Sequence, residues 1–230
     1  GNVGEKVMPV PMMNVLNGGV HADNTLDIQE FMLVPYRPES FKERLRMGTE
    51  IYHVLRTLLK QKGLTTAVGD EGGFAPELRD SREAIEFLLE AARQAGYQPG
   101  KDLGIALDVA SSELYREKEK RYYFPGESRG KGKKIARTSD DMMEYYENLI
   151  RDYPIYSIED PLDEEDWNGW SRLTMKIGEK VQLVGDDLFV TNPERVALGI
   201  ARKAANSVLI KVNQIGTLTE AAKAVELAHQ

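Results

Sequence analysis

Residues 104–110 carry the sequence GIALDVA, a short apolar run that closes on an acidic residue, Asp108. Three later stretches also place a charged residue at the end of an apolar run: IYSIEDP at 155–161, VQLVGDD at 181–187 and SVLIKVNQ at 207–214. Short apolar runs between turn residues are typical of strands buried on both faces of a parallel sheet. Helix-like segments separate the runs, in units of about 25 to 50 residues. This alternation predicts a parallel α/β fold.

Helix-start signals lie between the runs. Ser40 and Glu43 form a capping box ahead of an apolar stripe, and Thr217 and Glu220 repeat this pattern near the end of the chain. Further helix starts are expected at Ser81, at Ser139 and at the Asn192–Pro193 pair.

Two more strands are expected upstream, within residues 8–19 and 27–35, joined by a glycine-containing loop rather than by a helix. With these the chain has six candidate strands, whereas a closed (β/α)₈ barrel has eight in about 250 residues. The prediction is therefore a TIM-like barrel with an irregular start, incomplete because the sequence stops after a helix. All of residues 1–230 are expected to form one partial barrel domain.

The composition excludes several classes of function. The 230 residues are 41% hydrophobic, which suffices for one sizeable core. The chain has no cysteine, which rules out disulfides, thiolate metal sites and cysteine nucleophiles. A net charge of -7 argues against general nucleic-acid binding. No apolar run is long enough for a membrane span and no signal peptide is evident, so we expect a cytoplasmic protein.

Charged side chains end four successive predicted strands: Asp108, Glu159, Asp186 and Lys211. The carboxyl ends of parallel barrel strands form one face, where residues distant in sequence converge. Three carboxylates brought together repel one another unless a divalent cation neutralises them, and oxygen-only ligands suit magnesium. The sequence thus predicts a Mg²⁺ site at Asp108, Glu159 and Asp186. Any one of these acids alone is equally well explained as a strand-end or capping residue.

Lys211 interrupts an apolar run, where lysine is rarely found without a partner or a purpose. Near a metal its pKa is expected to fall from about 10.4 toward the range of a useful base. A general base is one interpretation of this residue. A structural lysine paired to one of the acids is the other.

Three upstream segments offer further candidates. Glu71 lies in the glycine-rich sequence VGDEGG at 68–73, where it is a candidate general acid, although such a sequence is more often a solvated turn. His21 follows a glycine pair and is a candidate for substrate binding, with a surface histidine as the alternative. Gln29 and Glu30 end the DIQE run, from which they are candidates to point into the site.

The other histidines and the one basic cluster are given structural interpretations. His53 falls within the first predicted helix and His229 at the end of the chain. Residues 129–137 carry the basic cluster, which is expected to be a solvated hairpin tip because it is flanked by glycines.

Seven motifs together resemble the enolase family, in order and in spacing, over essentially the whole chain. They are NVLNGG with His21, IQEFM with Glu30, VGDEGG with Glu71, LDVASSE with Asp108, SIEDP with Glu159, DDLFVTNP with Asp186 and LIKVNQIGT with Lys211. The resemblance implies the enolase barrel with its ββαα start. It also implies a lyase that interconverts 2-phosphoglycerate and phosphoenolpyruvate in glycolysis and gluconeogenesis.

The resemblance also implies residue roles. Asp108, Glu159 and Asp186 would hold Mg²⁺, and Lys211 would remove the proton from C2 of the substrate. Glu71 would protonate the departing C3 hydroxyl, with Glu30 beside it. Gln29 and His21 would be among the substrate contacts. Enolase-superfamily sites use a Lys or His base with one or two Mg²⁺ ions.

Enolases carry an α+β domain before the barrel and two strands after the position of Gln230, so we expect this chain to be partial, and inactive and poorly folded when isolated. The family implies a homodimer or an octamer. Two alternatives remain: another enolase-superfamily enzyme, such as a muconate-lactonising or racemase-like protein, and a non-catalytic role as a scaffold or, as for other bacterial enolases, a cell-surface protein. A variant that lacks a metal ligand but still binds a partner protein would distinguish the scaffold role from the catalytic one.

Overall fold

The computed structural model describes residues 7–230. Its main feature is a six-stranded sheet in the order β1-β2-β3-β7-β8-β9. The strands are β1 Met13–Asn17, β2 Glu30–Val34, β3 Gly104–Asp108, β7 Ile155–Glu159, β8 Gln182–Gly185 and β9 Ser207–Val208. All six expected strands are present.

The sheet has an antiparallel start and a parallel remainder. β1 pairs antiparallel with β2, and β2 pairs antiparallel with β3. From β3 onward the pairs β3·β7, β7·β8 and β8·β9 are parallel. Two helices, α1 (Phe41–Gln61) and α2 (Ser81–Gln94), follow β2 before β3 begins. The predicted ββαα start is therefore confirmed, and the fold is α/β, consistent with an incomplete barrel.

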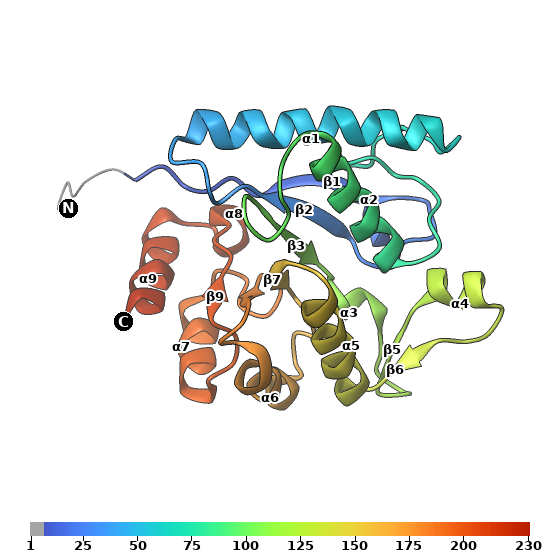
Figure 1. The fold of residues 1–230 in the computed structure, drawn as a ribbon. Coiled ribbons are helices and arrows are strands. Elements are labelled where there is room, and N and C mark those ends of the chain that lie inside the picture. Colours follow the sequence, from blue (N-terminus) through green and yellow to red (C-terminus); the bar gives the residue numbers. More distant parts are fainter. Residues whose placement is uncertain (1–6) are drawn as a thin grey trace.

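Helices surround this sheet, with α1 and α2 above the strands and the later helices below them in the view of Figure 1. α1 packs against α2, α5 (Ser139–Asp152) against α6 (Trp167–Ile177), and α6 against α7 (Pro193–Arg202), which in turn packs against α9 (Leu218–His229). Short 3-10 or helical turns at Gly19–His21, Ser111–Leu114 (α3) and Val212–Ile215 (α8) complete the connections. Among the described residues, no helix is both long and apolar enough to cross a membrane.

Side-chain capping fixes the helix starts. The Ser40 side chain accepts a hydrogen bond from Glu43 N at the start of α1, and Thr217 accepts one from Glu220 N at the start of α9. Helix α5 begins at Ser139, as expected, with Thr138 as its cap. Each such cap satisfies a backbone N–H that has no partner within the helix, which is worth about 1 kcal/mol.

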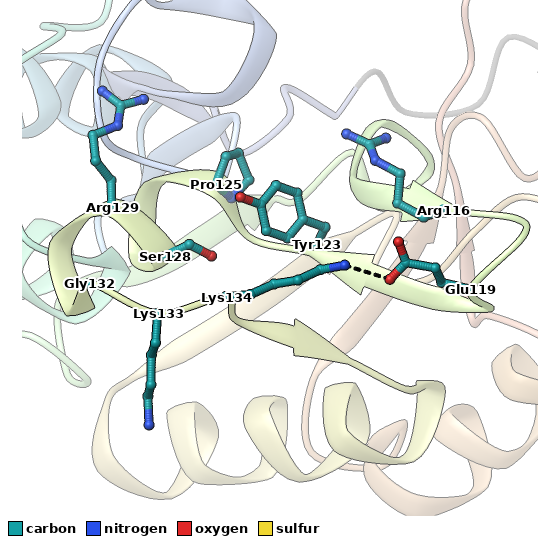
Figure 2. A pocket seen from close by; sticks show the side chains of 9 residues that line it. All are labelled: Arg116, Glu119, Tyr123, Pro125, Ser128, Arg129, Gly132, Lys133 and Lys134. Carbon is teal, nitrogen blue, oxygen red and sulfur yellow. Dashed lines mark hydrogen bonds and ion pairs between the residues drawn. The ribbon is translucent and has the colours of Figure 1, made fainter.

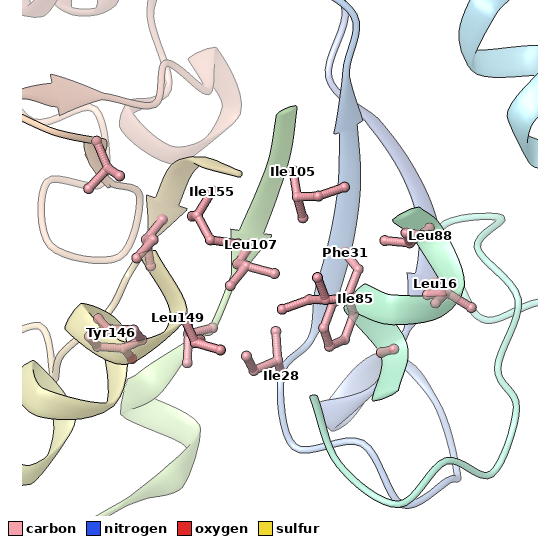
Figure 3. Packing of buried hydrophobic residues seen from close by; sticks show 14 of the residues in the cluster. Leu16, Ile28, Phe31, Ile85, Leu88, Ile105, Leu107, Tyr146, Leu149 and Ile155 are labelled. Carbon is pink, nitrogen blue, oxygen red and sulfur yellow. The ribbon is translucent and has the colours of Figure 1, made fainter. Parts of the chain in front are cut away.

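The main core lies between the sheet and the helices. Figure 3 shows Leu107 and Ile105 of β3 and Phe31 of β2 pointing toward Ile85 of α2 and Leu149 of α5. These side chains are fully buried. Because side chains alternate along a strand, the residues between them point to the other face.

That other face carries the chemistry. Met32, Val34 and Ala106 form a small apolar cluster there. Glu30 is two residues from Met32 and Asp108 is two residues from Ala106, so the same alternation turns both carboxyl groups to this face. Glu30 and Asp108 are direct cross-strand partners in the β2·β3 ladder.

A small subdomain is inserted between β3 and α5. Strands β4 (Tyr115–Arg116), β5 (Arg121–Tyr123) and β6 (Ala136–Arg137) form a separate sheet, and α4 (Pro125–Lys131) lies between β5 and β6. The expectation of a solvated hairpin tip at residues 129–137 is wrong in detail. Its lysines are exposed, but this segment spans the end of α4 and β6. The side chain of Arg137 is only 15% exposed and pairs with Glu127.

Candidate active site

Acidic side chains converge where the parallel strands end. Asp108 and Glu159 are the last residues of β3 and β7, and Asp186 directly follows β8. One carboxylate oxygen each of Asp108, Glu159 and Asp160 lies within 4.8 Å of the others. Asp186 belongs to a second such group, with Asp160 and Asp187. The three predicted metal ligands thus gather around Asp160.

Burial makes this cluster hard to ionise. It raises the pKa of Asp108 to about 7 and that of Glu159 to about 9, and the charges of neighbouring acids push both further up. Burial likewise raises the pKa of Asp160 to about 8. A bound divalent cation would offset this penalty, and a set made only of carboxylate oxygens suits Mg²⁺. The donor set therefore fits the expected metal.

Asp160 was not among the predicted site residues, yet it organises the cluster. Its two carboxylate oxygens accept hydrogen bonds from Asp186 N at 3.1 Å and from Asp187 N at 2.8 Å. Asp160 is 3% exposed and has a left-handed backbone conformation, with φ of 40°. It thus ties the end of β7 to the turn after β8 that presents Asp186. The adjacent acids in SIEDP and VGDD were the available sequence signal.

Lys211 does not lie inside a buried strand, which corrects the prediction. β9 ends at Val208, and Lys211 caps α8 with its side chain 45% exposed. Its ammonium group forms an ion pair with Asp186, and its backbone N–H donates to Thr191 Oγ1 at 2.8 Å. The fall in the pKa of Lys211 was expected beside a bound metal and stays a prediction. Burial lowers the pKa of Lys211, but the hydrogen bond and charge of Asp186 outweigh this and leave it above its usual value.

A second group joins His21, Glu30 and Glu71, each contributing one atom within 4.8 Å of the others. His21 Nδ1 lies 3.5 Å from Glu30 Oε1. Burial, with a hydrogen bond to Glu71, raises the pKa of Glu30 to about 9. The same hydrogen bond lowers the pKa of Glu71. The titrations of the two carboxyl groups are therefore linked, with the pKa of Glu30 raised and that of Glu71 lowered.

The sequence matches the family model described as the enolase C-terminal TIM barrel domain over residues 5–230. The chain belongs to this family. Membership confirms the barrel-type fold and the resemblance stated from the seven motifs. It also indicates an enzyme of the lyase type. Members of the enolase superfamily use Mg²⁺, and the acidic groups described above could hold such an ion.

Within this enolase barrel, Gln29 has a role beside the metal ligands. Its side-chain Nε2 donates to Asp108 Oδ2 at 2.9 Å, and Gln29 N donates to Asp108 O at 3.0 Å. Gln214 Nε2 makes the equivalent contact to Asp186 Oδ1 at 2.8 Å. Each amide fixes one carboxylate oxygen, while the other oxygen accepts from Ala110 N at 3.1 Å in Asp108 and pairs with Lys211 in Asp186. Gln214 was missed because nothing in its motif distinguishes it from a helix residue.

Asn14 and Asn17 on β1 support the loop that carries Glu71. Asn17 is fully buried, and its side-chain amide has no partner among the described residues. A Cβ added at Gly73 would lie 2.4 Å from Asn17 Oδ1, so the enolase loop packs directly on this amide. The side-chain amide of Asn14 likewise has no hydrogen-bond partner among the described residues. Buried polar groups without partners are rare and point to a local constraint.

The structure places every predicted site residue at one end of the sheet. His21, Glu30 and Glu71 meet on the β1–β2 side, and Asp108, Glu159 and Asp186 meet on the β3–β8 side. Lys211 is near both, because its charge acts on Glu30 and Glu71 as well as on Asp186. His53 lies within α1 and His229 at the end of α9, as expected for structural residues.

Proposed function

We propose that this chain forms the catalytic barrel of an enolase, which dehydrates 2-phosphoglycerate reversibly to phosphoenolpyruvate. The observation that carries the proposal is that two groups of side chains, one acidic with Lys211 and one containing Glu30 and Glu71, lie at the same end of the sheet. Asp108, Glu159 and Asp186 gather around Asp160, with Lys211 paired to Asp186, and the charges of Asp108 and Lys211 act on Glu30 of the Glu30–Glu71 pair. A dehydration of this kind needs a base at one carbon and an acid at its neighbour.

Asp108, Glu159 and Asp186 would hold Mg²⁺. When bound, the ion supplies positive charge to the substrate carboxylate, next to which the proton must leave. Gln29 and Gln214 orient two of these ligands from behind through the contacts to Asp108 and Asp186. The chain thus fixes its carboxylates before the substrate arrives, as catalytic preorganisation requires.

Lys211 would act as the base. The amine takes the proton from C2, the C2–H electron pair forms the C2–C3 double bond, and the C3–O bond breaks. Before this step Lys211 must lose both its own proton and its ion pair with Asp186. Once that ion pair is broken, the negative charge of Asp186 would be balanced at the metal site instead of by Lys211. The role of Lys211 as the base therefore depends on the role of Asp186 as a metal ligand.

The Glu30–Glu71 pair would supply the proton that turns the departing hydroxyl into water. In this proposal Glu30 holds the proton at neutral pH, because its pKa is raised. Its hydrogen bond to Glu71 provides the route by which the proton reaches Glu71, the residue that we assign to protonate the departing hydroxyl. His21 lies against Glu30 and is proposed to contact the substrate together with Gln29. A place in glycolysis and gluconeogenesis, and a cytoplasmic location, follow from this reaction and form part of the proposal.

Deuterium exchange tests the two halves of the mechanism separately. In the natural protein that carries this chain, Glu71→Gln should lose formation of phosphoenolpyruvate but keep Mg²⁺-dependent exchange of the C2 proton with solvent. Lys211→Ala should lose both. If Glu71→Gln also abolished exchange while its Mg²⁺ affinity stayed normal, the separation into base and acid would be refuted.

A further inference from the structure

The inserted subdomain has a cavity of about 870 Å³ on its surface, shown in Figure 2. We call it the basic recess. Its walls are formed by Arg116, Glu119, Tyr123, Pro125, Ser128, Arg129, Gly132, Lys133 and Lys134. Four of these side chains are cationic and one is acidic. None of the functional residues assigned above lines it.

Positive charge is concentrated around this recess. Residues 116–137 contain nine lysines or arginines and three glutamates, a net +6, although the whole chain carries -7. Such segregation produces a local positive potential on an otherwise acidic molecule. The segment is therefore electrostatically distinct from the rest of the barrel.

Several of these cations have no neutralising partner. Lys134 pairs with Glu119 at 2.7 Å and lies 5.7 Å from the centre of the Tyr123 ring. Arg129 and Lys133 have no ion-pair partner within residues 7–230. Arg116 contacts only backbone carbonyl oxygens, at 3.3 Å. An anion entering the recess would meet these charges without displacing an existing ion pair.

The wall that carries Arg129 is held rigidly. Asp27 accepts hydrogen bonds from Gly126 N at 2.7 Å and from Glu127 N at 2.8 Å, which anchors the start of α4 to the main barrel. Glu127 also pairs with Arg137 at 2.8 Å, and the Arg137 guanidinium lies 4.0 Å from the centre of the Phe124 ring. Anchored walls reduce the ordering cost of binding a ligand.

A second cavity, of about 360 Å³, adjoins the recess. It shares Arg116, Pro125 and Arg129 with the basic recess and extends to Gln29 and Ala110. Gln29 hydrogen bonds to Asp108. Asp27 and the exposed Glu113 also line this inner cavity, so its positive charge is confined to the shared outer end. The two arginines therefore line both cavities.

We propose that the basic recess is an anion-binding site that holds a small phosphorylated anion through Arg116 and Arg129, beside the entrance to the metal site. The ligand class follows from the unpaired cations, the limited volume and the continuity with Gln29. The negative charge of the remaining chain disfavours a long nucleic acid. The assignment of this ligand as substrate or product rests on the proposed function, whereas binding of the anion does not.

Titration of the Mg²⁺-free protein with inorganic phosphate, followed by NMR or calorimetry at low salt, tests this site. The arginine double variant shows whether saturable binding belongs to the recess, because it leaves the metal-ligand residues unchanged. We expect Arg116→Gln with Arg129→Gln to weaken binding about fivefold to tenfold, in line with the loss of charge-assisted contacts. Lys62→Gln with Lys180→Gln removes the same charge elsewhere and should leave binding unchanged.

Circular dichroism of each variant establishes that it is folded, and Lys133→Gln provides a second, exposed substitution with the same expected direction. Equal phosphate affinity in the arginine double variant and the natural protein would overturn the proposal, as would the absence of saturable binding. Much tighter competition by an oligonucleotide would also overturn it, by assigning the surface to nucleic acid. A failure of turnover alone would count against the proposed function and not against this site.

Discussion

Asp160 is the residue through which the account can be tested most quantitatively. Asp160→Ala removes the acceptors of two backbone N–H groups, those of Asp186 and Asp187, in a site that is 3% exposed. Each buried donor left unpaired costs about 1 to 3 kcal/mol. Alanine must also adopt the left-handed conformation that Asp160 has, which costs about 1 kcal/mol more than for aspartate or asparagine.

Two effects set the size of the expected loss. The missing acceptors lower the free energy of unfolding, whereas removal of a carboxyl group relieves repulsion from Asp108 and Asp187. At pH 6 the relief is small, because Asp160, with its pKa raised to about 8, is mostly protonated. We therefore expect a net loss of about 3 to 7 kcal/mol, or roughly 6 to 28 °C in Tm.

The assay is urea unfolding at pH 6 without metal, followed by circular dichroism. Asp160→Asn retains one acceptor and tolerates the left-handed backbone, so it should lose less than about 1.5 kcal/mol. Glu179→Ala, an exposed acid on another part of the barrel, should change stability by less than about 0.5 kcal/mol. If Asp160→Ala were as stable as the natural protein, Asp160 would not hold the turn that presents Asp186.

Three further predictions concern the site and the core. Asn17→Ala should lower turnover about tenfold or more, by letting the Glu71 loop move, while retaining Mg²⁺ affinity measured by calorimetry; unchanged turnover would contradict a supporting role. Without metal, stability should fall between pH 6 and pH 9. The pKa values of Asp108, Glu159 and Glu30 are raised to about 7, 9 and 9. The contribution of these groups to the free energy of unfolding is fully present below their ordinary pKa values and is lost as the pH rises through the raised ones. Thermal melts should show this fall in stability, and saturating Mg²⁺ should reduce it. Leu107→Ala should cost about 2 to 5 kcal/mol in urea unfolding, because Leu107 is fully buried between sheet and helices, and a loss below about 1 kcal/mol would argue against that packing.

The strand positions and most of the candidate site could be predicted from the sequence. Asp108 and Glu159 end runs so apolar that only buried strands explain them, and parallel topology then brings these ends together. Both residues do end their strands. The convergence followed from the fold class rather than from any single residue.

The environment of Lys211 could not be predicted in this way. Leu209 and Ile210 extend the apolar run before Lys211, but only Ser207 and Val208 pair with β8. An apolar run indicates that a segment is buried. It does not show at which residue the hydrogen bonds to the neighbouring strand end. The lysine is consequently half-exposed and ion-paired instead of buried in a strand.

Asp160 and Asn17 were missed for a different reason. Asp160 binds backbone N–H groups and Asn17 packs against a glycine, so their partners have no side-chain identity that a motif could reveal. Contacts of this kind depend on the final backbone path. They become visible only in the folded structure.

The most direct test of the central claim is the rate of Mg²⁺-dependent phosphoenolpyruvate formation, followed by absorbance, in the natural protein that carries this chain and in its Lys211→Ala variant. The account predicts clear activity that is abolished by chelation and reduced by several orders of magnitude in the variant, with Mg²⁺ still bound. Unchanged activity in Lys211→Ala would mean that another group takes the proton, and no activity even in the natural protein would contradict the assigned reaction.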